Sequence, residues 1–122
     1  CAIRIIPGGE HSQRLEHRIG AADANPYIIL SAVIASGLWG VKNKCPLMPM
    51  VKGNAYDVTF PEELTLPRTL WQAAQRLKKS QMAREYFGDA FVDHFVMSRE
   101  WEEREYRKHI SKWEMDRYFE II

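Results

Sequence analysis

Three charged side chains alternate along the early part of the sequence: Arg14, Glu16 and Arg18. In an extended strand, this alternation places all three on one face, about 6–7 Å apart. Two guanidinium groups beside a carboxylate suit a site that holds phosphate, a carboxylate substrate and a divalent metal ion. The alternative is a row of salt bridges on a solvated sheet surface, and the spacing alone favours that interpretation.

A pair of antiparallel strands would position these residues. We expect strands at residues 1–6 and 13–19, joined by the turn-forming Pro7-Gly8-Gly9. Arg4 then shares a face with the three alternating charges, while Leu15, His17 and Ile19 point to the covered side of the sheet. We interpret His17 as a buried, hydrogen-bonded histidine. Because a two-stranded hairpin is marginal by itself, the sheet needs strands from a missing part of the chain or from another chain.

A long apolar helix should follow the strands. Asn25 is a suitable N-cap and Pro26 suits the first helical position, so we predict a helix from Pro26 to about Lys42. Its sequence is apolar nearly all round, which is typical of a helix inside a larger protein. The proline-rich residues 43–68 predict a long irregular connection.

The second half of the chain is predicted to be helical from its capping signals and apolar spacing. The expected elements are a helix capped by Thr69 and ending near Lys79, a short helix Gln81–Tyr86 stopped by Gly88, a long helix capped by Asp89, and a restart at Ser111 with Glu114. Two i,i+4 pairs should support the long helix: Glu100 with Arg104, and Glu103 with Arg107. The fold class is therefore α+β, a short antiparallel strand pair followed by a mostly helical segment.

Composition narrows the classes of function. The 122 residues are 46% hydrophobic and 27% charged, as in ordinary soluble domains, and the net charge of +1 gives no case for nucleic acid or an acidic membrane surface. The longest apolar stretch, residues 27–41, is too short to span a bilayer. The two cysteines form no metal or disulfide pattern, which favours a reduced, cytoplasmic setting.

The segment Arg14–Tyr27, Arg-Leu-Glu-His-Arg-Ile-Gly-Ala-Ala-Asp-Ala-Asn-Pro-Tyr, resembles the signature near the end of the glutamine synthetase catalytic domain. Three more motifs agree in order and separation: Ala2-Ile3-Arg4-Ile5, Gly53-Asn54-Ala55-Tyr56-Asp57 and Leu66-Pro67-x-Thr69-Leu70. The resemblance covers essentially the whole chain. It implies that residues 1–122 are the C-terminal portion of a glutamine synthetase-type catalytic domain, a fragment of a larger chain.

The resemblance also implies a reaction and a set of roles. The reaction is an ATP-dependent ligation of glutamate to ammonia or an amine through a γ-glutamyl phosphate. Glu16 matches the glutamate that binds Mg²⁺ or Mn²⁺, and Arg18 matches the arginine that binds substrate glutamate. Arg4 and Arg14 match catalytic arginines on the nucleotide and phosphate side. With these motifs in place, we hold the salt-bridge interpretation to be the weaker one.

Several questions stay open at this stage. The His17–Tyr27 segment and the Arg-Glu-Trp-Glu-x-Arg-Glu-Tyr ending look more like the branch that includes γ-glutamylpolyamine synthetases, so the acceptor is ammonia or a polyamine. A non-catalytic scaffold of the same fold and a small helical interaction module are the alternatives. Tyr56 lies where some relatives are adenylylated, and we do not predict modification. We expect the fragment alone to be inactive. We also expect the enzyme to be a ring-shaped homo-oligomer, with a contact between subunits at Trp113–Ile122.

Overall fold

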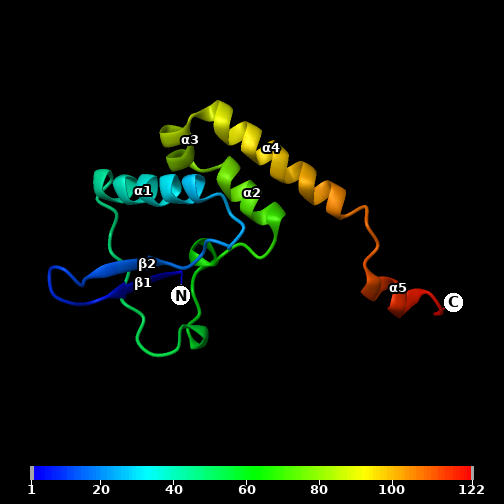
Figure 1. Ribbon diagram of the computed structural model, residues 1–122, viewed down its shortest axis with the longest axis horizontal. Helices are drawn as coiled ribbons and strands as arrows, with labels where there is room; N and C mark the ends of the chain where they lie inside the picture. The colour runs from blue at the N-terminus through cyan, green and yellow to red at the C-terminus, as the bar shows by residue number, and fades with distance from the viewer. Residues whose placement is uncertain (1, 122) are drawn as a thin grey trace. The chain divides into compact units, whose positions relative to one another are not determined.

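The computed structural model describes residues 2–121, which form two compact units that divide between Leu64 and Thr65. The first unit holds a β-hairpin and one long helix, and the second is entirely helical. Figure 1 shows both units along the chain from blue to red. Each unit is described separately below.

The hairpin of the first unit consists of β1 (Ile3–Ile6) and β2 (Arg14–His17), paired antiparallel. Arg4 lies opposite Glu16, and Ile6 lies opposite Arg14. The connecting loop closes on Gly9, whose carbonyl accepts hydrogen bonds from the backbone of residues 12 and 13. The predicted pairing is confirmed, although both strands are shorter than residues 1–6 and 13–19.

Helix α1 (Pro26–Lys42) begins and ends where the sequence predicted. The Asn25 side chain accepts hydrogen bonds from the backbone N–H groups of Tyr27 and Ile28, at 3.0 and 3.3 Å. In α1 only Ala35 is buried. A stripe of large apolar side chains with heptad-like spacing stays more than half exposed: Tyr27, Leu30, Ile34, Leu38 and Val41. The apolar character that predicted an interior helix is thus present, but the first unit does not cover it.

Residues 43–68 form an irregular connection, as predicted, and most of it belongs to the first unit. It contains two short 3₁₀ turns, η1 (Ala55–Asp57) and η2 (Glu62–Leu64). Asn54 caps η1 by accepting a hydrogen bond from the backbone of Tyr56 at 3.2 Å. Tyr56 is 97% exposed.

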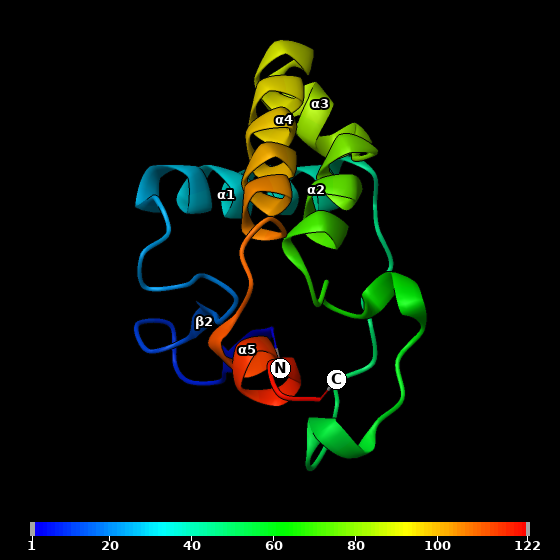
Figure 2. The same cartoon turned by 90° about the vertical axis from the view of Figure 1, so that its right-hand side faces the viewer.

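Three helices form the core of the second unit: α2 (Leu70–Lys78), α3 (Gln81–Phe87) and α4 (Asp89–Tyr106). Figure 2 shows α2 and α3 lying beside α4. The contact is made by small and β-branched residues, which allow close approach of the helices. The buried residues are Ala74, Ala83, Val92 and Val96, with Leu77 and Phe87 packed against them.

Asp89 does not cap α4, so that prediction is wrong. Gly88, with a φ of 80°, occupies the N-cap position, and Asp89 is the first helical residue. Its carboxylate instead accepts a hydrogen bond from Arg84 at 2.6 Å. Arg84 also donates to Asp93 at 2.8 Å and to the Lys78 carbonyl at 2.9 and 3.1 Å. The hydrogen bonds from Arg84 to Asp93 and Asp89 raise the pKa of the guanidinium. A side chain from α3 therefore joins the end of α2 to the start of α4.

One of the two predicted ion pairs on α4 forms as expected. Arg107 lies 2.9 Å from Glu103. Glu100 accepts hydrogen bonds from Gln75 at 2.7 Å and Lys78 at 3.2 Å on the neighbouring helix α2. Hydrogen bonds from Gln75 and Lys78 lower the pKa of the Glu100 carboxyl. Tertiary packing of α2 on α4 thus redirects this carboxylate.

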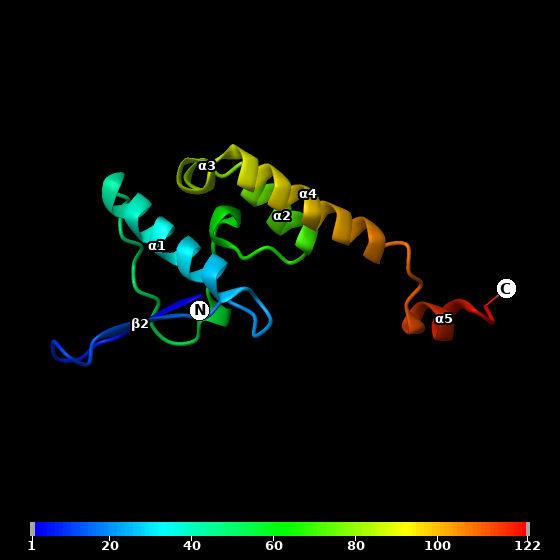
Figure 3. The same ribbon diagram turned by 45° about the horizontal axis from the view of Figure 1, so that its top comes forward.

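The last helix, α5 (Lys112–Tyr118), lies beyond the end of α4 in Figures 1 and 3, away from α2 and α3. The predicted capping box is confirmed, because Ser111 and Glu114 exchange side-chain and backbone hydrogen bonds. Hydrogen bonds from the Ser111 hydroxyl and then from its backbone N–H to the Glu114 carboxylate lower the pKa of that carboxyl. The large apolar residues of α5 and of the stretch just after it are all more than half exposed: Trp113, Met115, Tyr118, Phe119 and Ile121.

Candidate functional site

The hairpin brings the predicted site residues together on one side, and we call Arg4, Arg14, Glu16 and Arg18 the charged face. Arg4 and Glu16 are directly opposite in the strand register, and Arg14 precedes Glu16 by two residues. Arg18 lies just beyond β2, where its backbone N–H donates to the Ala2 carbonyl at 2.8 Å. That hydrogen bond extends the pairing by one step and keeps the alternation of side chains. The prediction that Arg4 shares a face with the other three is confirmed.

Two arginines converge on one oxygen of Glu16. Arg4 Nη1 lies 3.4 Å from Glu16 Oε2, and Arg18 Nε lies 3.9 Å from the same atom. The Arg4 and Arg18 side chains are 54% and 50% exposed, and that of Glu16 is 33% exposed. Two guanidinium groups therefore lie close to the carboxylate and still reach solvent.

The charged face has a surplus of positive charge. Three guanidinium groups and one carboxylate, +3 and −1, leave a net charge of +2. Guanidinium groups bind phosphate and carboxylate oxygens in a bidentate manner. Such a face favours a polyanion such as a nucleotide, or a dicarboxylate such as glutamate.

The opposite side of the hairpin is apolar and uncovered. Ile3, Ile5 and Leu15 are 52%, 65% and 56% exposed, and Ile19 is 48% exposed. His17, predicted to be buried and hydrogen-bonded, is exposed. That prediction is wrong for this chain because no part of the described chain covers this side of the sheet.

Glu16 supplies one hard oxygen donor, which suits Mg²⁺ or Mn²⁺ in kind. Mg²⁺ takes about six oxygen ligands in near-octahedral geometry. Within residues 2–121, no group of three or more His, Cys, Asp or Glu side chains could hold a metal ion. Among the described residues, the charged face could therefore supply one carboxylate ligand to a divalent ion through Glu16.

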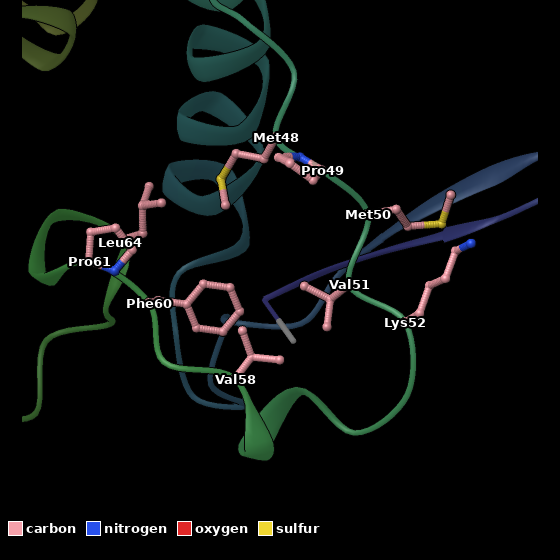
Figure 4. A pocket seen from close by; sticks show the side chains of 9 residues that line it. All are labelled: Met48, Pro49, Met50, Val51, Lys52, Val58, Phe60, Pro61 and Leu64. Atoms are coloured by element: carbon pink, nitrogen blue, oxygen red, sulfur yellow. The ribbon is translucent and has the colours of Figure 1, made fainter.

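A second feature of the first unit is an apolar pocket of about 450 Å³ in the irregular connection. Figure 4 shows Val51, Val58 and Phe60 pointing toward one another across it. Lys52 is its one charged lining residue. The pocket was not predicted, and the methionines and prolines of this stretch were its only sequence signal. It lacks the groups that phosphoryl or acyl transfer needs, so it does not compete with the charged face as a candidate site.

The other polar candidates do not form a second site. The thiol of Cys45 is free and exposed. His94 lies exposed on α4 and His109 lies exposed after it. None of the helices in the described part of the chain is long and apolar enough to cross a membrane.

Comparison with known proteins finds a matching family and several similar proteins. Residues 1–118 match the family described as glutamine synthetase, catalytic domain. The chain is 46% identical to type-1 glutamine synthetase 2 of Dictyostelium discoideum, over 99% of this chain and 23% of that protein. It is 36% identical to the glutamate–isopropylamine ligase of a Pseudomonas species, over 98% of this chain and 26% of the relative. It is 33% identical to the gamma-glutamylethanolamide synthetase of Streptomyces coelicolor, over 98% of this chain and 25% of that protein.

These relatives share the family but differ in the acceptor that their names give. The chain spans about a quarter of the length of each of them. The match nevertheless includes the hairpin, α1 and all three helices of the second unit's core. The chain therefore belongs to the glutamine synthetase catalytic-domain family.

Proposed function

We propose that this chain is part of an ATP-dependent ligase that joins glutamate to ammonia or another amine through a γ-glutamyl phosphate. The observation that carries the proposal is the charged face, where Arg4 and Arg18 contact the carboxylate of Glu16 and Arg14 lies on the same side of the hairpin. The relatives support it, since their names describe a glutamine synthetase and two ligases that attach glutamate to small amines. A scaffold would have no need for a polyanion site of this kind.

Each residue of the charged face takes a role that suits its chemistry. Arg18 binds a carboxylate of glutamate through its guanidinium fork. Arg4 and Arg14 bind the nucleotide phosphates and stabilise the negative charge that spreads over the transferring phosphoryl group. Glu16 provides one ligand for Mg²⁺ or Mn²⁺, and the bound ion would neutralise part of the same charge.

The proposed reaction has two steps. A side-chain carboxylate oxygen of glutamate attacks the γ-phosphorus of ATP, and the bond to ADP breaks. The amine nitrogen then attacks the activated γ-carbonyl carbon, inorganic phosphate leaves, and the nitrogen loses a proton. The charged face stabilises the first step, but its arginines cannot accept that proton at neutral pH. The base must therefore come from another part of the enzyme.

We infer that residues 1–122 are the C-terminal portion of a longer catalytic domain and are inactive alone. The share of the relatives that the chain spans supports this, as do the uncovered apolar sides of the hairpin and α1. The remaining metal ligands would come from the rest of the domain or from an adjacent subunit. We place the enzyme in the cytoplasm, where ATP and glutamate are available.

We also propose that the enzyme is a ring-shaped homo-oligomer in which α5 and the residues after it contact a neighbouring subunit. The apolar side chains exposed on this short helix support the proposal. Deleting residues 111–122 should reduce the molar mass of the complete enzyme measured by light scattering. An unchanged mass would contradict the contact.

Phosphate release by the complete enzyme tests the reaction and identifies the acceptor. The assay contains ATP, glutamate and Mg²⁺ with ammonia, isopropylamine, ethanolamine or putrescine in separate reactions. A preference for ammonia indicates glutamine formation, whereas a preference for putrescine supports the alternative, a γ-glutamylpolyamine synthetase. Absence of turnover with every amine, in an enzyme that is folded and assembled, would favour the non-catalytic scaffold.

A further inference from the structure

Residues 18–25 form the segment that joins β2 to α1, and Arg18 is its first residue. At its start, the backbone N–H of Arg18 donates to the Ala2 carbonyl at 2.8 Å. At its end, Asn25 caps α1. Between these points a tight turn forms, in which the Ala24 N–H donates to the Ala21 carbonyl at 3.1 Å. The segment is thus fixed to the hairpin at one end and to α1 at the other.

A glycine lies where this segment passes α1. A Cβ atom added at Gly20 would lie 2.9 Å from Cδ1 of Ile29, and 3.8 and 4.0 Å from its Cγ2 and Cγ1. Carbon atoms in good contact are about 3.5–4.0 Å apart, so the first distance is a clash and the other two are ordinary contacts. A side chain at residue 20 must therefore displace Cδ1, the flexible end of the Ile29 side chain, and the segment moves away from α1 only where Ile29 cannot rotate aside.

Backbone conformation does not explain this glycine. Among the described glycines only Gly53 and Gly88 have a positive φ, so residue 20 adopts a conformation that other residues can reach. Close approach to Ile29 is the remaining physical reason for its small size. The contact spans from the segment that follows Arg18 to the first turn of α1.

We propose that Gly20 and Ile29 form a positioning pair that sets the location of Arg18 for glutamate binding. This inference rests on the proposed role of Arg18. Gly20 follows Arg18 by only two residues, so a shift of the segment away from α1 moves the backbone that carries the guanidinium. Movement of that guanidinium also changes its 3.9 Å approach to Glu16.

A mutant cycle in the complete enzyme tests the pair. Gly20→Ala introduces the clashing Cβ, and Ile29→Val removes Cδ1, the atom that it would meet. We expect Gly20→Ala to raise the KM for glutamate about three- to tenfold, since small misplacements of a positioning group have effects of this kind. The KM for ATP should stay within about twofold of wild type. The double variant Gly20→Ala/Ile29→Val should recover most of the loss.

Gly9→Ala is the matched control, because a Cβ there would meet nothing within 4 Å. We expect wild-type kinetics from it. Thermal unfolding of every variant, together with the Kd for glutamate measured by calorimetry, separates positioning from general destabilisation. Equal increases in both KM values for Gly20→Ala, or no recovery in the double variant, would overturn the inference.

Arg18→Lys distinguishes failure of the pair from failure of the proposed function. If Arg18→Lys does not change the Kd for glutamate, the role assigned to Arg18 is wrong and the positioning inference falls with it. If Arg18→Lys weakens glutamate binding but Gly20→Ala does not, only the positioning pair is refuted. In that case rotation of the Ile29 side chain accommodates the added methyl group.

Discussion

The substitution Glu16→Gln tests whether the Glu16 carboxylate serves the reaction or only forms surface salt bridges. It keeps the size of the side chain and its ability to accept hydrogen bonds, but removes the charge that Arg4 and Arg18 share. At 3.4 and 3.9 Å, each pair is worth only about 1 kcal/mol of Coulomb attraction in a water-like dielectric. Side-chain entropy and salt screening reduce this further, since both arginines are half exposed.

We therefore expect Glu16→Gln to change the free energy of unfolding by less than about 1 kcal/mol. Its effect on function should be much larger. Substitution of groups that merely orient a metal ligand costs about 10–100-fold, so loss of the ligand itself should lower turnover by at least about a hundredfold. Binding of Mn²⁺, followed by electron paramagnetic resonance, should weaken in parallel.

Two measurements on the complete enzyme decide the matter: denaturant unfolding, and phosphate release with Mn²⁺ titration. A matched control is Glu103→Gln, which removes a carboxylate that also pairs with an arginine but lies on α4. The control should leave turnover near wild type. If Glu16→Gln behaves like the control in both measurements, the charged face is a solvated salt-bridge row and our reasoning is wrong.

Three further outcomes follow from the second unit. Val92→Ala removes two methyl groups from a fully buried site. It should lower the free energy of unfolding in urea by about 2–3 kcal/mol, from lost apolar burial and the cavity together. Met97→Ala, at an exposed position, should lower it by less than about 0.5 kcal/mol. Because the pKa of Glu100 is lowered in the folded state, its ionised carboxylate stabilises the fold at pH values above the ordinary pKa of 4.5. This contribution is lost as the pH falls below that value. Glu100→Gln should therefore flatten the acid limb of a thermal-unfolding series between about pH 5 and 3, and an unchanged slope would contradict it. Ser111→Ala removes the capping box and should reduce the helicity of α5 in NMR secondary chemical shifts, while α4 stays unaffected.

Local chemistry in the sequence was sufficient to predict most elements of this protein. Asn25 followed by proline located the start of α1, and the Thr69 and Ser111 signals located two further helix starts. These predictions succeeded because a cap is a contact between residues two or three positions apart. Period-two alternation likewise placed Arg14, Glu16 and Arg18 on one side of a strand before any pairing was known.

Tertiary packing decided what local patterns could not. Asp89 looked like a cap, but Arg84 from the preceding helix engages its carboxylate while Gly88 takes the cap position. Glu100 looked like a partner for the next turn of its own helix, but α2 supplies Gln75 and Lys78 instead. In both cases donors from a neighbouring helix compete with the local geometry on which the prediction relied.

The charged face shows the same division. The sequence by itself determined which residue types alternate and which family they resemble. Only the strand register placed Arg4 opposite Glu16, and only the path of the chain brought Gly20 against Ile29. Register and close approach depend on contacts between residues that are distant along the chain, and the spacing within one segment carries no information about them.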